Sequence, residues 1–290
     1  MSKFPTSAAE IELRGLGRVI DPGRITEAQL HRVHEAAYVA SIKSGEYNEF
    51  TRQRLGLPWT PQLCARSFAA TAGTLRATYA ALEDGLAANL AGGTHHSFPD
   101  RGEGYCVFND VAVAIRSLQH EDPSFCAMVV DLDAHQGNGT HYIFDADPRV
   151  YTYSLHVGPN YPSRKHPGSM DVELPRYAAS GMFFDRLLAT LPEAVQQAEP
   201  DVAYFIAGVD VHENDRFGQM TLSTRQMRDR EQYTIDLLRD HSIPTVIVYG
   251  GGYNRTEGMT AKLHVQTIEV ASGRFLRERG KLNAQCSETM

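Results

Sequence analysis

Short apolar runs separated by longer helical patterns are the feature that most restricts how this 290-residue chain can fold. The runs are largely continuous rather than alternating, and each is about as long as one strand. Strands without a polar face, alternating with helices, are typical of a parallel sheet covered by helices on both sides. We therefore expect an α/β fold with a central, mostly parallel sheet in a three-layer α/β/α arrangement. The expected strands cover residues 86–91, 127–133, 150–155, 202–208 and 245–249.

Helical periodicity and capping residues place helices between these strands. Thr26 and Thr60 are suitable N-cap residues, and Pro61 then falls at the first helical position. The helix that begins at Pro61 is expected to run to about residue 90 and to be relaxed near Gly73. The first 25 residues show no clear pattern, and residues 158–171 form a loop rich in proline and glycine. The other expected helices cover residues 27–44, 106–118, 138–144, 181–197, 222–241 and 259–276.

Composition excludes several classes of protein. The formal charge of −7, with no run of Lys or Arg longer than two, lacks the basic footprint of a nucleic-acid-binding protein. A mildly acidic surface would suit a basic peptide substrate, although net charge alone is weak evidence for one. No apolar run approaches ~18–20 residues, so no membrane span is expected.

Cellular context and organisation follow from other features. The N-terminal residues lack the apolar region of a signal peptide, and the four cysteines have no CxxC spacing. They fit reduced thiols, which favours a cytoplasmic location. With no repeat or linker, one domain over residues 1–290 is the simplest organisation, and the oligomeric state stays unknown.

Acidic and histidine side chains follow the expected strands at their carboxyl ends. Asp131, Asp133 and His135 come directly after one apolar run, and Asp210 follows another. Ligands of open parallel sheets bind at this edge. Two carboxylates and a neutral histidine are typical of a catalytic Zn²⁺ or a similar divalent ion with an open coordination position. The alternative is that the aspartates cap helices or loops and the histidine lies on the surface.

Two adjacent histidines, His95 and His96, follow a Gly-Gly turn. Hydrolysis at a metal needs a base for the water and an acid for the leaving amine. Two imidazoles with different partners can divide these tasks, and Asp131 and Asn138 are suitable partners, one charged and one neutral. The alternative is a chance pair in a chain with 12 histidines.

Aromatic residues in three loops complete the candidate site. Tyr253 follows three consecutive glycines, and its hydroxyl could donate to an oxyanion that develops beside a metal. Tyr105 follows Gly104, and Tyr161 lies in a Pro-containing loop; these rings could wall a channel for a long aliphatic side chain. Taken singly, each ring is more typical of a packing or surface position.

Five segments together resemble the histone deacetylase family and its bacterial relatives, which have the arginase/deacetylase fold. In chain order they are GGTHHSFPDRGEGYCVFND, DLDAHQGNGT, YSLHVGPNYP, AGVDVHENDRFG and YGGGY. The resemblance covers about residues 30–275, and the DLDAHQGNG segment is most similar to the class IV branch.

The resemblance implies two metal sites. Zn²⁺ would be bound by Asp133, His135 and Asp210, a ligand set that Fe²⁺ also suits. A monovalent cation, usually K⁺, would lie beneath it. That cation would take the main-chain oxygens of Asp131, Asp133, His135 and Leu155 and the side chain of Ser154.

The resemblance also implies catalytic and substrate-binding roles. His95 would pair with Asp131, and His96 with Asn138, with His96 as the base for the zinc-bound water. Tyr253 would polarise the scissile carbonyl. The substrate would be bound by Gly104, which accepts from its amide, by Tyr105, Tyr161 and Phe217, which line the acyl-lysine tunnel, and by Gly252.

The chain departs from the family pattern in three places. The family has a strand before a segment like the opening MSKFP, so we expect either that this strand lies upstream of residue 1 or that this part of the sheet is built differently. Asn138 stands where some branches have Asp, which removes a negative charge near His96. The loop of residues 210–217 contains His212 and Glu213, so we expect a different pocket rim.

The sequence therefore predicts a zinc-dependent amidohydrolase that removes an acyl group, acetyl or longer, from N-acyl-lysine. Three alternatives stay open. The first is the same chemistry on an acetylpolyamine or another small N-acyl amine. The second is a binuclear, arginase-like hydrolase. The third, of a different class, is a catalytically silent acyl-lysine binding module. The sequence does not fix the acyl length or the physiological substrate.

Overall fold

A computed structural model describes the backbone of residues 3–288 and the side chains of residues 3–273. Its centre is one open sheet of six strands, and every neighbouring pair is parallel. The strand order is β1-β6-β5-β2-β3-β4. The strands are β1 Leu86–Asn89, β2 Ala127–Asp131, β3 Val150–Val157, β4 Met170–Leu174, β5 Val202–Ile206 and β6 Thr245–Val248.

The direction in which strands are added reverses between β2 and β5. From β2 the chain adds β3 and then β4 on one side, and it then returns to place β5 and β6 on the other side. Crevices at such a reversal are where open α/β sheets bind ligands, at the carboxyl ends of the strands. Asp131, Asp133 and His135 follow β2, and Asp210 follows β5, so the polar residues lie at this point.

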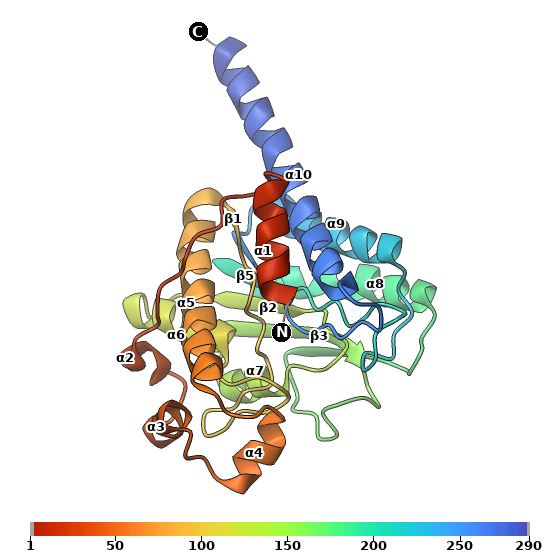
Figure 1. The fold of residues 1–290 in the computed structure, drawn as a ribbon. Coiled ribbons are helices and arrows are strands. Elements are labelled where there is room, and N and C mark those ends of the chain that lie inside the picture. The colour runs from red at the N-terminus through yellow and green to blue at the C-terminus, as the bar shows by residue number, and fades with distance from the viewer. Residues whose placement is uncertain (1–2, 289–290) are drawn as a thin grey trace.

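Helices cover both faces of the sheet (Figure 1). Strand residues alternate between the two layers, because successive side chains point to opposite faces. Tyr204 and Val246 pack with α5 and α6, whereas Phe205 and Ile247 pack with α8 and α9. The helices are α1 Lys3–Leu13, α2 Glu27–Leu30, α3 Ala36–Ser44, α4 Glu49–Leu55, α5 Pro61–Asp84, α6 Asp110–Glu121, α7 Asn138–Phe144, α8 Ser180–Ala198, α9 Thr224–Asp240 and α10 Met259–Glu288.

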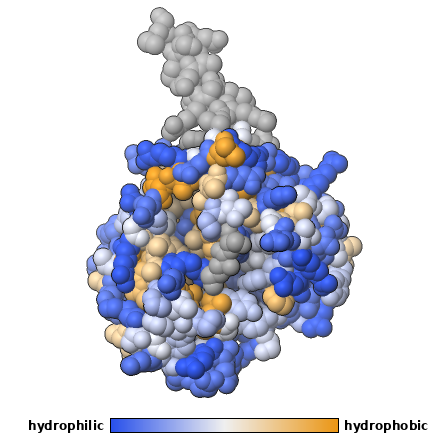
Figure 2. All heavy atoms as spheres, viewed as in Figure 1, coloured by the Kyte–Doolittle hydropathy of each residue, from blue (hydrophilic) through white to orange (hydrophobic). Residues whose placement is uncertain are grey.

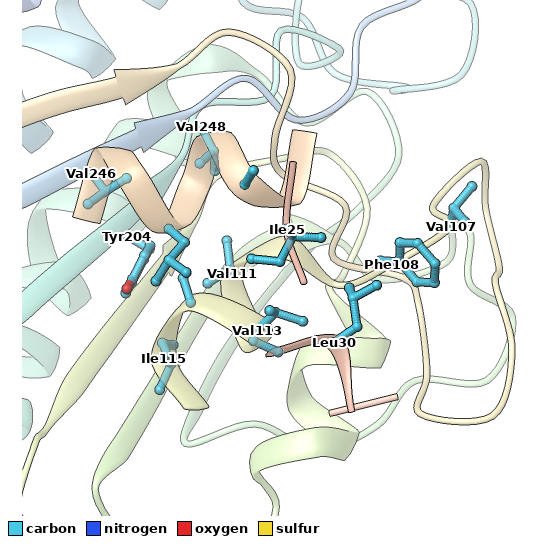
Figure 3. Packing of buried hydrophobic residues seen from close by; sticks show 14 of the residues in the cluster. Ile25, Leu30, Val107, Phe108, Val111, Val113, Ile115, Tyr204, Val246 and Val248 are labelled. Atoms are coloured by element: carbon cyan, nitrogen blue, oxygen red, sulfur yellow. The ribbon is translucent and has the colours of Figure 1, made fainter. Parts of the chain in front are cut away.

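The first layer shows how the sequence produces this packing. In α6, Val111 and Ile115 are four residues apart and lie on one helical face, which packs against Tyr204 of β5 (Figure 3). All three side chains are fully buried or nearly so. Asn109 caps the helix by accepting from the backbone of Ala112, so α6 begins at residue 110 and not at residue 106 as the sequence pattern predicts.

Three other expectations differ from the structure. The helix expected over residues 27–44 is broken, because His34 turns inward and bonds the carbonyl of Phe98 and the amide of Asn109. Helix α5 continues through Gly73 without interruption. The glycine leaves room for the Asn89 side chain, because a Cβ at residue 73 would lie only 2.7 Å from Asn89 Oδ1. The loop expected over residues 158–171 ends earlier, because residues 170 and 171 begin the edge strand β4.

The N-terminal segment is also helical. Helix α1 packs beside α10 (Figure 1), where Ile11 joins a small apolar cluster with Val265 and Ile268. Its helical pattern is weak, so tertiary packing supplies most of its stability. The surface in the view of Figure 2 is largely hydrophilic, with hydrophobic side chains in scattered patches. Among the described helices, none is long and apolar enough to cross a membrane.

Candidate active site

Asp133, His135 and Asp210 converge at the carboxyl ends of β2 and β5. All three are buried, and one potential ligand atom from each lies within 4.8 Å of the other two. The Nδ1 atom of His135 lies 3.1 Å from Asp133 Oδ1 and 2.9 Å from Asp210 Oδ2. Four atoms placed tetrahedrally ~2.0 Å from an ion would be ~3.3 Å from one another. These three side chains therefore fit a divalent ion.

Backbone amides orient both carboxylates. Gly251 donates to Asp133 Oδ2 at 2.7 Å, and Ala134 donates to Asp210 Oδ1 at 2.9 Å. The remaining oxygens face His135. The glycine is required, because a Cβ at position 251 would lie 2.5 Å from Asp210 Oδ2. The glycine run after β6 thus lets the backbone reach the carboxylates.

The charges of this group favour a cation. Burial and the nearby charge of Asp133 raise the pKa of Asp210 to about 7. Two buried carboxylates this close repel one another, and a bound divalent ion removes that repulsion. The donor set of two oxygens and one imidazole nitrogen suits Zn²⁺, and also Fe²⁺.

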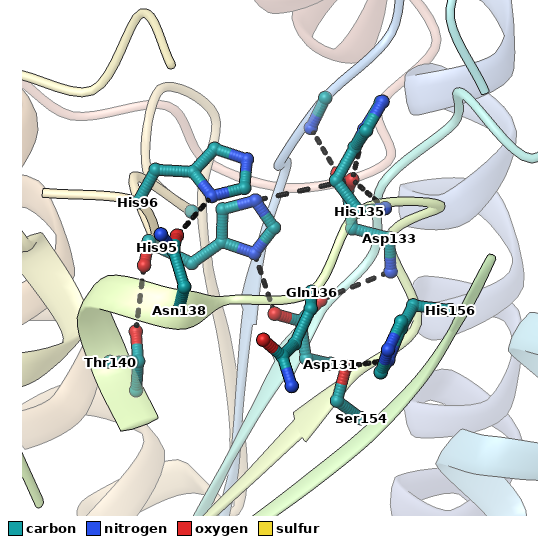
Figure 4. A network of polar contacts seen from close by, with 12 residues as sticks. His95, His96, Asp131, Asp133, His135, Gln136, Asn138, Thr140, Ser154 and His156 are labelled. Atoms are coloured by element: carbon teal, nitrogen blue, oxygen red, sulfur yellow. Dashed lines mark hydrogen bonds and ion pairs between the residues drawn. The ribbon is translucent and has the colours of Figure 1, made fainter. Parts of the chain in front are cut away.

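His95 is held next to a carboxylate. Its Nδ1 lies 2.6 Å from Asp131 Oδ2 (Figure 4). Burial disfavours the charged ring, but the carboxylates of Asp131 and Asp133 outweigh burial and raise the pKa of His95 to about 9. Asp131 also accepts from the Asp133 amide, at 3.1 Å. It therefore orients both a histidine and the strand end that carries a candidate metal-binding carboxylate.

His96 has a neutral partner. Its Nδ1 lies 2.8 Å from Oδ1 of Asn138, the first residue of α7 (Figure 4). Burial and the positive charges of His95 and His135 hold the pKa of His96 well below its usual range. The two rings are 4.1 Å apart between centroids. One imidazole is thus stabilised in its charged form and the other in its neutral form.

Tyr253 is fixed by the loop that follows β5. Its amide donates to Asp215 Oδ2 at 2.6 Å, and the other oxygen of Asp215 accepts from the amides of Phe217 and Gly218. The ring of Phe217 lies 5.1 Å from the Tyr253 ring. Burial raises the pKa of Tyr253 well above its usual value, so its hydroxyl stays protonated and can donate. The sequence patterns did not indicate Asp215.

A cavity joins these groups to the surface. An inner part of about 350 Å³ is lined by both histidines, the three metal-binding candidates and Tyr253. An outer part of about 360 Å³ is lined by Tyr161, Asn160 and the end of α4. Both parts share the residues His96, Gly104, Tyr105, His135, Arg216, Phe217 and Tyr253.

The predicted substrate-binding residues occupy different places in this cavity. Tyr105, Tyr161 and Phe217 lie partly exposed at the mouth. Gly104 has φ of +55°, and a Cβ there would lie 2.6 Å from the His96 ring. Gly252 lines neither part of the cavity, and a Cβ there would lie 2.5 Å from Val209.

The proposed potassium ligands come from the end of β2, from the residues that follow it and from β3. Asp131 and Ser154 are register partners on β2 and β3, and Leu155 follows in a fully buried position. The Ser154 hydroxyl lies 2.9 Å from His156 Nδ1 (Figure 4). The structure thus places the end of β2 beside the middle of β3, and potassium binding stays a prediction.

His212 and Glu213, which we expected to alter the pocket rim, do not lie there. His212 is buried, where its Nδ1 accepts from the backbone of Asn214, and Glu213 lines neither part of the cavity. Arg216 of the same loop is exposed at the mouth, where its Nε donates to the Tyr253 carbonyl at 3.1 Å. The DVHENDRF segment contains Arg216, but only the geometry of the loop shows that this residue, and not His212 or Glu213, faces the cavity.

Comparisons with known proteins agree with this geometry. The family model described as "Histone deacetylase domain" matches residues 5–268. An uncharacterized protein of Picosynechococcus is 37% identical over 81% of this chain and 79% of its own length. Histone deacetylase 2 of Arabidopsis thaliana is 27% identical over 87% of this chain and 66% of its own length. The acetoin utilization protein AcuC of Staphylococcus aureus is 26% identical over 82% of this chain and 67% of its own length.

Proposed function

Since this chain belongs to the histone deacetylase family, whose members are hydrolases acting on amide bonds, we propose that it is a zinc-dependent deacylase of N-acyl-lysine. The observation that carries the proposal is the content of the inner cavity. A group that fits a divalent ion, a histidine paired with a carboxylate, a histidine paired with an amide and a tyrosine all line the same space. A cytoplasmic location and a single domain remain part of the proposal.

The chain's own residues can carry the proton transfers. Asp133, His135 and Asp210 would hold the divalent ion, which would supply Lewis-acid polarisation of the carbonyl and of the attacking water. His96 Nε2 takes the proton of the water, because its Nδ1 is engaged by Asn138. The same nitrogen then gives that proton to the leaving amine, and the nearby charge on His95 makes this donation favourable.

Tyr253 and His95 stabilise the negative charge that develops during the reaction. The Tyr253 hydroxyl donates to the oxygen of the scissile carbonyl as negative charge develops there. His95, held protonated by Asp131, lies beside the same carboxylates and contributes positive charge without moving. Both groups are fixed before the reaction, by Asp131 in one case and by Asp215 in the other.

The mouth of the cavity favours acyl-lysine over a polyamine. The charged side chains among the described residues that line its outer part are Arg54 and Arg216, with no carboxylate. A polyamine carries further ammonium groups, which Arg216 would repel, whereas the charge of Arg54 is offset by Glu103 at 3.6 Å. A lysine substituted on its nitrogen carries no charge at that end. We expect peptides with acidic or neutral residues around the acyl-lysine to be preferred, even though a basic peptide would suit the net charge of −7.

A substrate panel tests the proposal. Acetyl-lysine peptides, long-chain acyl-lysine peptides and acetylpolyamines are compared by the free amine that each releases. We expect the highest kcat/KM for an acyl-lysine peptide and no release by the Asp210→Asn variant. Higher kcat/KM for an acetylpolyamine would contradict the substrate assignment. Zinc binding without turnover of any substrate would instead support an acyl-lysine binding module.

A further inference from the structure

Glu103 is a buried carboxylate in the loop between β1 and α6, outside the set of residues implied by the family resemblance. It is 3% exposed. Its Oε1 accepts from Asn138 Nδ2 and from the Tyr161 hydroxyl, each at 3.2 Å. The guanidinium groups of Arg54 and Arg101 lie 3.6 and 3.5 Å from Oε2 and offset its charge.

This carboxylate fixes the orientation of the Asn138 amide. An ionised carboxylate only accepts hydrogen bonds, so the NH₂ group of Asn138 must face Glu103. The amide oxygen then faces His96, where Oδ1 lies 2.8 Å from Nδ1. The opposite orientation would place two acceptors against each other at one end of the amide.

The oriented amide in turn determines the tautomer of His96. An amide oxygen can only accept, so Nδ1 of His96 must carry the proton, and Nε2 keeps the lone pair that a base needs. We propose that Glu103 is a positioning residue which acts through Asn138 to hold His96 in its base-competent tautomer. This inference rests on the proposed deacylase function, but the tautomer itself can be measured without substrate.

The same geometry explains how the chain uses Asn at position 138. A carboxylate at this position would accept from His96 whichever way it is turned, whereas an amide needs a second group to orient it. Glu103 is that group, one residue further from the ring. Position 138 itself carries no negative charge. The charge is instead on Glu103, which is separated from His96 by the side-chain amide of Asn138.

Exchanging acid and amide along this relay tests the proposal. In Glu103→Gln, the new amide can donate to Asn138 Oδ1, so both tautomers of His96 become accessible. We expect kcat to fall roughly 10- to 100-fold, a part of what general-base catalysis supplies. Asn138→Asp alone places two carboxylates against each other and also lowers kcat. The double variant Glu103→Gln/Asn138→Asp restores donor and acceptor at every step, and its kcat should return to within about threefold of wild type.

Glu121→Gln is the matched control. Glu121 also accepts from a tyrosine hydroxyl, that of Tyr79 at 2.5 Å, but it lies at the end of α6, outside the cavity. Its substitution should leave kcat unchanged. A kcat for the double variant equal to the product of the two single effects would show independent structural damage and would overturn the proposal, as would an unchanged kcat in Glu103→Gln.

The protonation of the two ring nitrogens of His96 can be measured independently of activity. Nitrogen-15 spectra of histidine-labelled protein, assigned by comparison with His96→Gln, should show Nδ1 protonated and Nε2 unprotonated in the wild type. Glu103→Gln should shift the population toward protonated Nε2. A wild type that already carries its proton on Nε2 overturns the proposal even if the variant does not fold. Absence of turnover with the expected tautomer would refute the deacylase function alone.

Discussion

Replacing Tyr253 with phenylalanine removes one hydroxyl and leaves the ring where it is packed. The rings of Phe217 and Tyr105 lie 5.1 and 5.8 Å from it, and Asp215 holds its amide at 2.6 Å. Among the described residues none bonds the hydroxyl, so its removal leaves no buried partner unsatisfied. The cost should therefore fall on catalysis and not on folding.

The expected loss is that of one donor aimed at an oxyanion. Such a donor contributes about 3–4 kcal/mol, so kcat should fall about 100- to 1,000-fold while KM changes little. Steady-state kinetics on an acyl-lysine peptide and a thermal melt of each protein measure the two costs separately. Tyr249→Phe is the control, because Tyr249 is buried but lies outside the cavity. An unchanged kcat in Tyr253→Phe would refute the assigned role.

Three further predictions concern the scaffold around the site. Gly104→Ala should lower kcat with little loss of zinc, because its Cβ would lie 2.6 Å from the His96 ring at a backbone φ of +55°; unaltered kinetics would refute this. Arg230 is fully buried, donates to the carbonyls of Leu132 and Gly208 and pairs with Glu231. Urea unfolding of Arg230→Met should show that the free energy of unfolding falls by about 3–5 kcal/mol, since the buried Glu231 is left without its charged partner. The fall should be smaller when Glu231 is also replaced. Burial lowers the pKa of His34 to about 4. Its contribution to stability is therefore complete above pH ~6.5 and declines as the pH falls toward 4, by about 2 kcal/mol at pH 5, and His34→Gln should remove that part of the pH dependence.

The ends of the buried strands could be predicted from the sequence because their chemistry is local. Asp133 and His135 interrupt an apolar run, and Asp210 interrupts another 75 residues later, so each stands out against its own strand. The parallel arrangement of the strands then requires these ends to share one edge of the sheet. The predicted fold class, an α/β fold with a parallel sheet, is confirmed. It could be predicted because the apolar runs that form the strands are also local features.

Other features depend on loop geometry that no periodic pattern encodes. Glu103 reaches Asn138 because the loop between β1 and α6 turns it inward, and in the sequence it is one of many acidic residues. Arg216 faces the cavity while its neighbour Asp215 binds backbone amides, a difference that the composition of the loop cannot reveal. Net charge likewise describes the whole surface and not the mouth of one cavity.

The central claim is that Asp133, His135 and Asp210 hold one divalent ion that serves amide hydrolysis. The most direct test titrates metal-stripped protein with Zn²⁺ while bound metal and acyl-lysine turnover are recorded in the same samples. We predict that activity rises in proportion to occupancy and reaches its limit at one ion per chain, with weak binding and no activity in Asp210→Asn. A limit near two ions per chain, or tight binding that survives the substitution, would contradict the claim.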